Sequence, residues 1–137
     1  MDSFALIIFG ITSNLAQIKL IPALYDMAEN GMLPEKISII GTARKPQTAD
    51  EFRDYITKVL QTENKHHAHP IKEDVLQNLL QKMHFVDGNL DDPHFYQKLK
   101  TFLDQLSSQG QQCNNKIFYL ATYPELYQTT FDHLKLT

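Results

Sequence analysis

The sequence predicts an α/β fold in which helices cover both faces of a doubly wound parallel sheet. The continuous apolar run Phe4–Phe9 is typical of a strand that is buried on both faces. Such runs alternate along the chain with segments whose apolar residues recur at helical spacing, which favours parallel strands joined by right-handed crossovers. We expect about four strands in the order 3-2-1-4, within one domain over residues 1–137. Because doubly wound sheets usually have more strands, we expect an incomplete sheet in a fragment of a larger protein.

The first half of the chain is predicted to continue with a helix, a strand and a second helix. Apolar spacing predicts a helix over Leu15–Met27, with a kink or restart at Pro22 because proline lacks the N–H that an interior helical residue uses. Ile37–Gly41 is predicted as the second buried strand. Thr48 and Glu51 form a capping-box pattern that opens the next helix.

The second half of the chain repeats this alternation. A helix is predicted over Lys72–Lys82 and a third strand over His84–Asp87. Asp92-Pro93 then has the pattern of a helix start, because proline fits the first helical position. The remaining predictions are Gly110 as the end of that helix, a fourth strand over Lys116–Ala121, and a last helix from Pro124.

The composition predicts a soluble globular domain. A formal net charge of -3, with scattered Lys and Arg residues, gives no general attraction to nucleic acid or to anionic membranes. No run approaches the ~20 apolar residues that a membrane-spanning helix needs. Cys113 is the only cysteine, which excludes an intrachain disulfide and favours the reducing cytoplasm.

The segment from Gly10 to Lys19 lies between the first predicted strand and the first predicted helix, where α/β domains bind phosphate groups. Gly10 allows a tight turn, and Thr12, Ser13 and Asn14 offer polar contacts and helix caps. The generic G-x-G-x-x-G fingerprint needs more glycines than this loop has, so a plain helix cap is the alternative. Its position nevertheless indicates a pyrophosphate site in a Rossmann-like domain.

Two cations follow the second predicted strand, at the place where a dinucleotide fold holds the adenosine ribose. An acidic residue there would favour NAD. Arg44 and Lys45 instead offer positive charge to a 2′-phosphate, so NADP is the favoured cofactor. The alternative is that both are solvated loop residues.

Four segments extend this interpretation. Ile8–Ala16 with Lys19 is similar to the motif I-F-G-A-S-G-D-L-A-x-x-K, and Gly31–Glu35 is similar to G-L-L-P-E. Ile40–Arg44 is similar to V-G-Y-A-R, and Phe118–Tyr127 to F-Y-L-A-L-P-P-x-x-Y. In their order and spacing, the four segments resemble those of the glucose-6-phosphate dehydrogenase family.

The resemblance implies an NADP-binding domain of an oxidoreductase. The family's whole enzyme, an expected homo-oligomer, transfers hydride from glucose 6-phosphate to NADP and forms 6-phosphogluconolactone in the pentose phosphate pathway. By resemblance, Arg44 contacts the 2′-phosphate, Lys19 lies near the cofactor and Tyr127 contacts it near the nicotinamide end. The pyrophosphate loop by the same resemblance comprises Gly10, Ile11, Thr12, Ser13, Asn14, Leu15 and Ala16.

The chain also departs from the family's pattern. Ser13 stands in place of the loop's second glycine, where a side chain would crowd the pyrophosphate, and Asn14 replaces an aspartate. The family's E-K-P and R-I-D-H-Y-L-G-K segments, which include its catalytic histidine, have no counterpart here. We therefore expect no catalytic residue in this chain and no activity from it alone. The alternative is a non-catalytic Rossmann-like nucleotide-binding or protein-interaction module.

A metal site is not expected from the histidines. His66, His67 and His69 are dense enough to bind a transition metal, but their hydrophilic surroundings favour a solvated loop.

Overall fold

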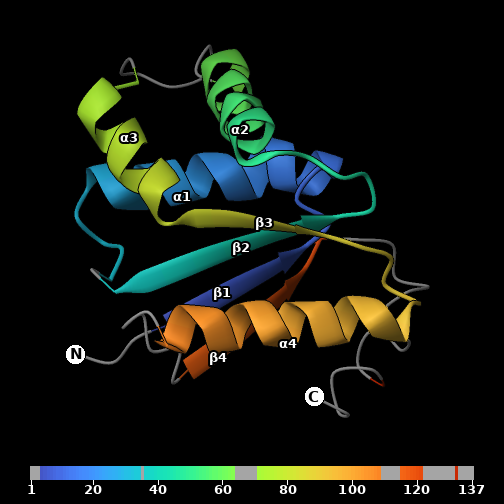
Figure 1. Ribbon diagram of the computed structural model, residues 1–137. Helices are drawn as coiled ribbons and strands as arrows, with labels where there is room; N and C mark the ends of the chain where they lie inside the picture. Colours follow the sequence, from blue (N-terminus) through green and yellow to red (C-terminus); the bar gives the residue numbers. More distant parts are fainter. Residues whose placement is uncertain (1–3, 35, 64–70, 109–114, 122–131, 133–137) are drawn as a thin grey trace.

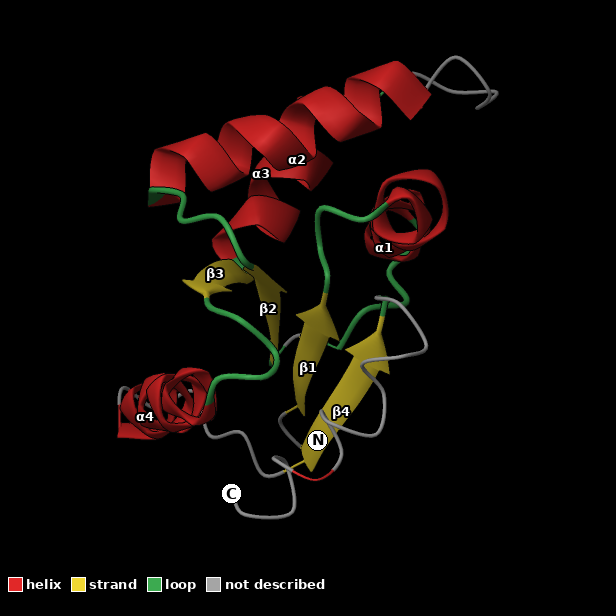
Figure 2. Cartoon of the chain, turned by 90° about the vertical axis from the view of Figure 1, so that its right-hand side faces the viewer, coloured by secondary structure: helices red, strands yellow, loops and turns green. Residues whose placement is uncertain are grey.

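The computed structural model contains the predicted doubly wound sheet. It describes residues 4–34, 36–63, 71–108, 115–121 and 132. Within these residues, all strand pairings are parallel and the strand order is β3-β2-β1-β4, which confirms the predicted order. Figure 2 views the sheet from the edge at which its strands end. The strands are β1 (Phe4–Phe9), β2 (Ile37–Ala43), β3 (Met83–Asp87) and β4 (Asn115–Leu120).

The central strand β1 packs on both faces of the sheet, as its continuous apolar run predicts. Ala5, Ile7 and Phe9 belong to one core cluster, whereas Ile8 belongs to the other. Successive side chains of a strand point to opposite faces, so a strand covered on both sides needs apolar residues at nearly every position.

The first predicted helix starts with an unusual turn. A π-helical turn, η1 (Ala16–Leu20), precedes α1 (Ile21–Glu29), and the Ile21 N–H donates to the carbonyl of Ala16. Pro22 is the second residue of α1, directly after this change of hydrogen-bonding register, and it has no N–H to donate to the preceding turn. The predicted restart therefore occurs one residue before Pro22.

Two of the three other described helices begin with the predicted caps, whereas the helix that follows Lys72 begins without a side-chain cap. The Thr48 N–H donates to Glu51 Oε1 over 2.9 Å, and the Glu51 N–H donates to Thr48 Oγ1 over 3.1 Å, which confirms the capping box. Asp92 Oδ1 likewise accepts from the His94 N–H over 3.0 Å. The helices are α2 (Ala49–Glu63), α3 (Glu73–Gln81) and α4 (Pro93–Ser108).

The helices form one layer on each side of the sheet. Helices α1, α2 and α3 cover one face and α4 covers the other (Figure 1). Tyr25 and Phe52 are buried in the first layer and Phe95 in the second. No described helix is both long and apolar enough to span a membrane. The predictions for Gly110, the helix from Pro124, the three clustered histidines and Tyr127 lie outside the described residues.

Candidate functional site

A cavity lies at the edge where the strands end. The chain proceeds from β1 through β2 to β3 and then returns to the other side of β1, so the strand order reverses between β1 and β4. Ligands of doubly wound folds bind at such a reversal. A cavity of about 640 Å³ opens there, and loops after every described strand contribute to it. Its walls are Gly10, Thr12–Leu15, Thr42–Arg44, Gly88–Asp91 and Ala121.

The turn after β1 is held against the end of β2. Gly10 has φ of 87°, a conformation that side chains with a Cβ disfavour. The N–H groups of Gly10 and Ile11 both donate to the Thr42 carbonyl, over 3.1 and 2.9 Å. Thr42 is buried, and its hydroxyl donates to the Ile8 carbonyl over 3.2 Å. The start of the loop is therefore fixed before any ligand binds.

A tyrosine of α2 orients the next peptide group. The Tyr55 hydroxyl donates to the Ile11 carbonyl over 2.9 Å. Because this peptide is trans, the Thr12 N–H points away from Tyr55. Burial raises the pKa of Tyr55 to about 12, against a smaller opposite effect of the hydrogen bond with Gln17. The phenol thus remains a protonated donor at neutral pH.

Ser13 is the residue that replaces a family glycine, and its side chain caps the helix. Ser13 Oγ accepts from the Ala16 N–H over 3.2 Å, while the Ser13 N–H donates to the Gly10 carbonyl over 3.0 Å. The hydroxyl is therefore engaged by the first helical turn. Asn14 and Leu15 open that turn, where N–H groups lack carbonyl partners within the helix and favour an anion.

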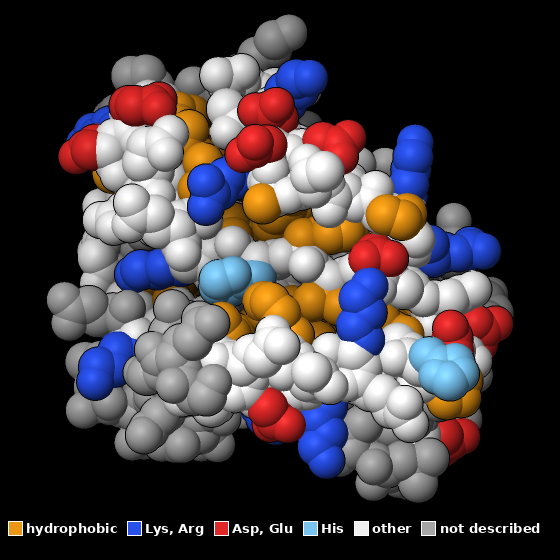
Figure 3. Space-filling view, viewed as in Figure 1, with side chains coloured by type: hydrophobic (Ala, Val, Ile, Leu, Met, Phe, Trp, Pro, Cys, Tyr) orange, Lys and Arg blue, Asp and Glu red, His pale blue; other side chains and the backbone are white. Residues whose placement is uncertain are grey.

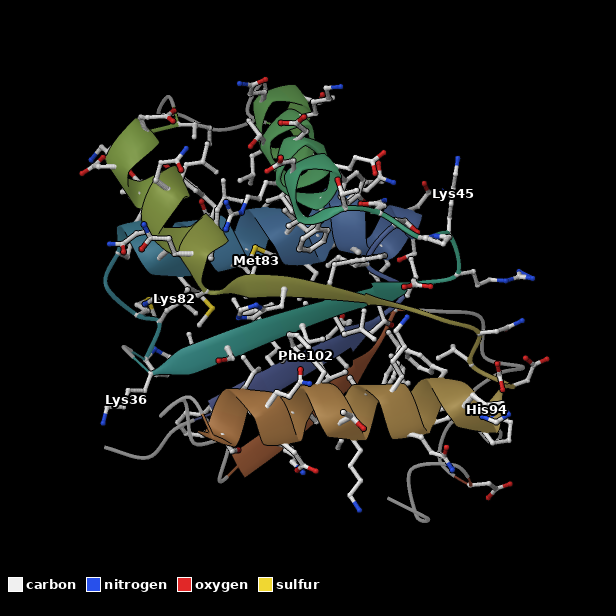
Figure 4. All side chains as sticks on the ribbon, in the orientation of Figure 1. Lys36, Lys45, Lys82, Met83, His94 and Phe102 are labelled. Atoms are coloured by element: carbon white, nitrogen blue, oxygen red, sulfur yellow. The ribbon has the colours of Figure 1, made fainter. Side chains whose placement is uncertain are left out.

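The structure separates the predicted site residues into two groups. Gly10, Thr12, Ser13, Asn14, Leu15 and Arg44 line the cavity together. Ile11 and Ala16 are instead buried in the core, and Lys19 is exposed on η1 outside the cavity wall. Lys45 is also exposed and projects from the loop after β2 without lining the cavity (Figure 4).

The sequence interpretation missed one wall of the cavity, the loop Gly88–Asp91 after β3. The Gly88 N–H donates to the Ala43 carbonyl over 2.9 Å, which holds this loop against the end of β2. The rule that drew attention to Arg44, that residues following a parallel strand face the binding edge, applies equally here. A glycine directly after the predicted strand was the available signal. Within the described residues, no group of potential ligands could hold a metal ion.

The fold and the cavity at its reversal point define the class of Rossmann-like nucleotide-binding domains. Residues 7–137 match the family model described as "Glucose-6-phosphate dehydrogenase, NAD binding domain". The chain therefore belongs to the glucose-6-phosphate dehydrogenase family.

Individual relatives agree with this assignment. The chain is 30% identical over 129 residues to a glucose-6-phosphate 1-dehydrogenase of Chlamydia muridarum, covering 94% of this chain and 25% of the relative. The Mycobacterium avium enzyme superimposes with a TM-score of 0.82 at 24% identity, covering 98% of this chain and 27% of that one. A glucose-6-phosphate dehydrogenase solved with its substrate glucose-6-phosphate gives 0.81 at 24% identity, covering 98% and 28%. The two structures confirm the fold, and the chain spans about a quarter of the length of these proteins.

Proposed function

We propose that this chain, over residues 1–137, is the NADP-binding domain of a glucose-6-phosphate dehydrogenase. The observation that carries the proposal is the cavity whose wall joins the Gly10 turn to Arg44 in a member of this family. Its volume of about 640 Å³ lies within the range typical of small-molecule and cofactor sites, roughly 300–1,000 Å³.

The residues present fit a dinucleotide phosphate. The N–H groups of Thr12, Asn14 and Leu15, with the positive end of the helix, would hold the pyrophosphate. Ser13 Oγ accepts from the Ala16 N–H, which leaves the hydroxyl proton free to donate to the phosphate. By family resemblance, Lys19 and Tyr127 would add contacts nearby.

The preference for NADP over NAD would come from Arg44. This side chain is exposed at the end of β2 and lines the cavity, where its guanidinium would pair with a 2′-phosphate. The residues that end β2 include no carboxylate that would repel this phosphate. Lys45 would supply a second, more solvated positive charge.

Membership of the family supports a proposal for the activity of the whole protein. NADP, when bound, supplies the acceptor for the hydride that leaves glucose 6-phosphate as 6-phosphogluconolactone forms. We propose a cytoplasmic homo-oligomer whose catalytic histidine belongs to a segment without a counterpart in this chain. Purified chain mixed with glucose 6-phosphate and NADP should therefore form no NADPH, and measurable turnover would contradict that part of the proposal.

Calorimetry tests the cofactor directly. The chain should bind NADP more tightly than NAD, and Arg44→Ala should weaken NADP binding roughly ten- to hundredfold, since a charged hydrogen-bonding partner is lost. NAD binding should not change. Arg53→Ala is the matched control, because it removes an exposed arginine of α2 that does not line this cavity. Equal affinity for both cofactors would refute the assignment of Arg44, and an intact fold that binds neither would favour the non-catalytic module.

A further inference from the structure

The side chain of Gln17 contacts the loop to which the proposed function assigns the pyrophosphate. Gln17 belongs to the π-helical turn η1, is half-buried, and is not among the described residues of the cavity wall. Its Nε2 donates to the Thr12 carbonyl over 2.9 Å. Thr12, in contrast, lines the cavity. Gln17 can therefore act on the ligand site through Thr12, without a ligand contact of its own.

A second hydrogen bond joins Gln17 to Tyr55. The Tyr55 phenol already donates its proton to the Ile11 carbonyl over 2.9 Å, so the glutamine amide is the donor in this second bond. The Thr12 carbonyl can also only accept. One amide group can serve both partners, because its nitrogen carries two protons. Gln17, Tyr55 and the carbonyls of Ile11 and Thr12 thus form one network.

This network fixes the two peptide groups on either side of the Thr12 Cα. The peptide before Thr12 is held at the Ile11 carbonyl by Tyr55, and the peptide after it is held at the Thr12 carbonyl by Gln17. A backbone hydrogen bond of the Ser13 N–H fixes the other end of that second peptide. Because the first peptide is trans, the Thr12 N–H then points in one direction, opposite to the Ile11 carbonyl.

The direction of these peptide groups matters for an anionic ligand. A carbonyl oxygen carries partial negative charge, so a peptide that turns its oxygen toward a phosphate replaces an attraction with a repulsion. The N–H groups of a loop bind phosphate only while they point at it. A loop whose peptides are already oriented also loses less conformational freedom when the ligand binds.

We propose that Gln17 is a positioning residue of the cofactor site, which holds the Thr12 carbonyl, and through Tyr55 the Ile11 carbonyl, in the orientation that presents the Thr12 N–H to the pyrophosphate. The inference rests on the proposed function, because it concerns how the same cavity binds NADP. The π-helical turn that carries Gln17 agrees with it, since such turns are rare and occur frequently at functional sites. The pyrophosphate is common to NADP and NAD, so Gln17 should affect both, unlike Arg44.

Calorimetry on the 137-residue chain tests this proposal with three ligands, NADP, NAD and inorganic pyrophosphate. Gln17→Met keeps the length of the side chain and removes the donor, so it should weaken all three by the same factor, roughly three- to tenfold. Gln77→Met is the matched control. It removes an amide hydrogen bond of 2.8 Å to Glu73 on α3, outside the cavity wall, and should leave the three affinities unchanged.

A second variant separates loss of the donor from loss of stability. Gln17→Glu keeps the shape of the side chain and places an acceptor where the network needs a donor. A carboxylate near a helix start favours the helix, so urea unfolding should show no loss of stability. The variant should nevertheless bind the three ligands at least as weakly as Gln17→Met does.

A double variant tests whether Gln17 and Tyr55 act together. Tyr55→Phe removes the hydroxyl that joins Gln17 to the Ile11 carbonyl. When it is combined with Gln17→Met, the loss of NADP affinity should be smaller than the product of the two single losses, because both residues hold the same loop.

Several outcomes would overturn the inference. If wild-type chain binds NADP and either Gln17 variant binds it equally well, the inference is wrong and the proposed function stands. A loss confined to NADP would contradict it as well, since NAD contains the same pyrophosphate. Single losses that multiply fully in the double variant would show that Gln17 and Tyr55 act separately. If wild-type chain binds none of the three ligands, the proposed function and this inference both fail.

Discussion

The proposed cofactor cavity and the pocket at the β3 edge differ in the chemical groups of their walls. The cofactor cavity is bounded by loops at the strand ends and offers the N–H of Thr12, a helix start and Arg44. The pocket at the β3 edge is bounded by rings from three elements and by the polar side chains of Gln47, Arg53 and Gln81. Figure 3 faces this edge and shows apolar side chains and a histidine at the surface between α2 and α4. A site made largely by backbone groups should depend less on any one side chain than a site whose walls are side chains.

The largest expected effect concerns the packing of the loop after β3, which forms one wall of the cavity at the strand ends. A Cβ at Gly88 would lie 2.3 Å from Phe95 Cδ1 and 2.9 Å from Phe95 Cβ. Gly88→Ala should therefore lower the free energy of unfolding by about 3 kcal/mol, because the core below the cavity must shift and because φ of +158° also disfavours a Cβ. Gly31→Ala, where a Cβ meets nothing within 4 Å but φ is +67°, should cost only about 1 kcal/mol. Urea unfolding of both variants measures the difference, and equal costs would show that the loop after β3 is not constrained by packing.

A smaller effect concerns Tyr55. It separates the function of this residue in orienting the loop after β1 from its contribution to the stability of the fold. Tyr55→Phe removes the hydrogen bond to the Ile11 carbonyl and should cost about 1 kcal/mol of stability. It should also weaken NADP binding several-fold, because the Thr12 peptide is no longer held. Tyr25→Phe is matched, since its hydroxyl accepts from the Lys72 N–H far along the chain from the loop. Calorimetry showing the same NADP affinity for both variants would contradict the orienting function of Tyr55.

The smallest expected effect is a pH dependence of the free energy of unfolding, which comes from His84. Burial, reinforced by Arg53, lowers the pKa of His84 in the folded chain. The unfolded chain then binds the proton more readily, so the free energy of unfolding should fall as pH drops below about 6.5 and level off below the folded pKa. The loss should be less than about 1 kcal/mol, because the ring is only half-buried.

Replacement of this histidine isolates its contribution. His84→Gln should flatten the pH dependence of urea unfolding between pH 7 and 5, whereas His94→Gln, at an exposed position of α4, should not. If the free energy of unfolding varies with pH in the same way for wild type and His84→Gln, the imidazole ring of His84 does not cause the pH dependence.

Much of the fold was predictable because its causes are local. The Thr48–Glu51 capping box involves residues three positions apart, and the strand Phe4–Phe9 is marked by its own apolar run. The π-helical turn before Pro22 was not predictable in detail, because an apolar spacing does not distinguish one hydrogen-bonding register of a helix from another. The end of β2 extends to Ala43 because it pairs with Asp87 of β3, a residue distant in sequence.

The candidate site shows the same division. Gly10 and Arg44 could be placed at the binding edge from sequence, because both follow strands of a parallel sheet. Ile11 and Thr12 are adjacent in sequence, yet Ile11 is fully buried and Thr12 lines the cavity. Sequence alone could not separate them, since the hydrogen bonds that orient this turn come from Thr42 and Tyr55.

The sequence by itself determined the alternation of strands and helices, the strand order through the handedness of crossovers, and the edge that carries the Gly10 turn. Only the tertiary structure decided which loop residues face the cavity, that Gly88–Asp91 completes it, and that Gln47 lines one pocket with three phenylalanine residues at the β3 edge. The physical reason is the distance in sequence between the residues that interact. Periodicity and capping act over a few residues, whereas the direction of a side chain in a loop depends on contacts with elements that are far away in sequence.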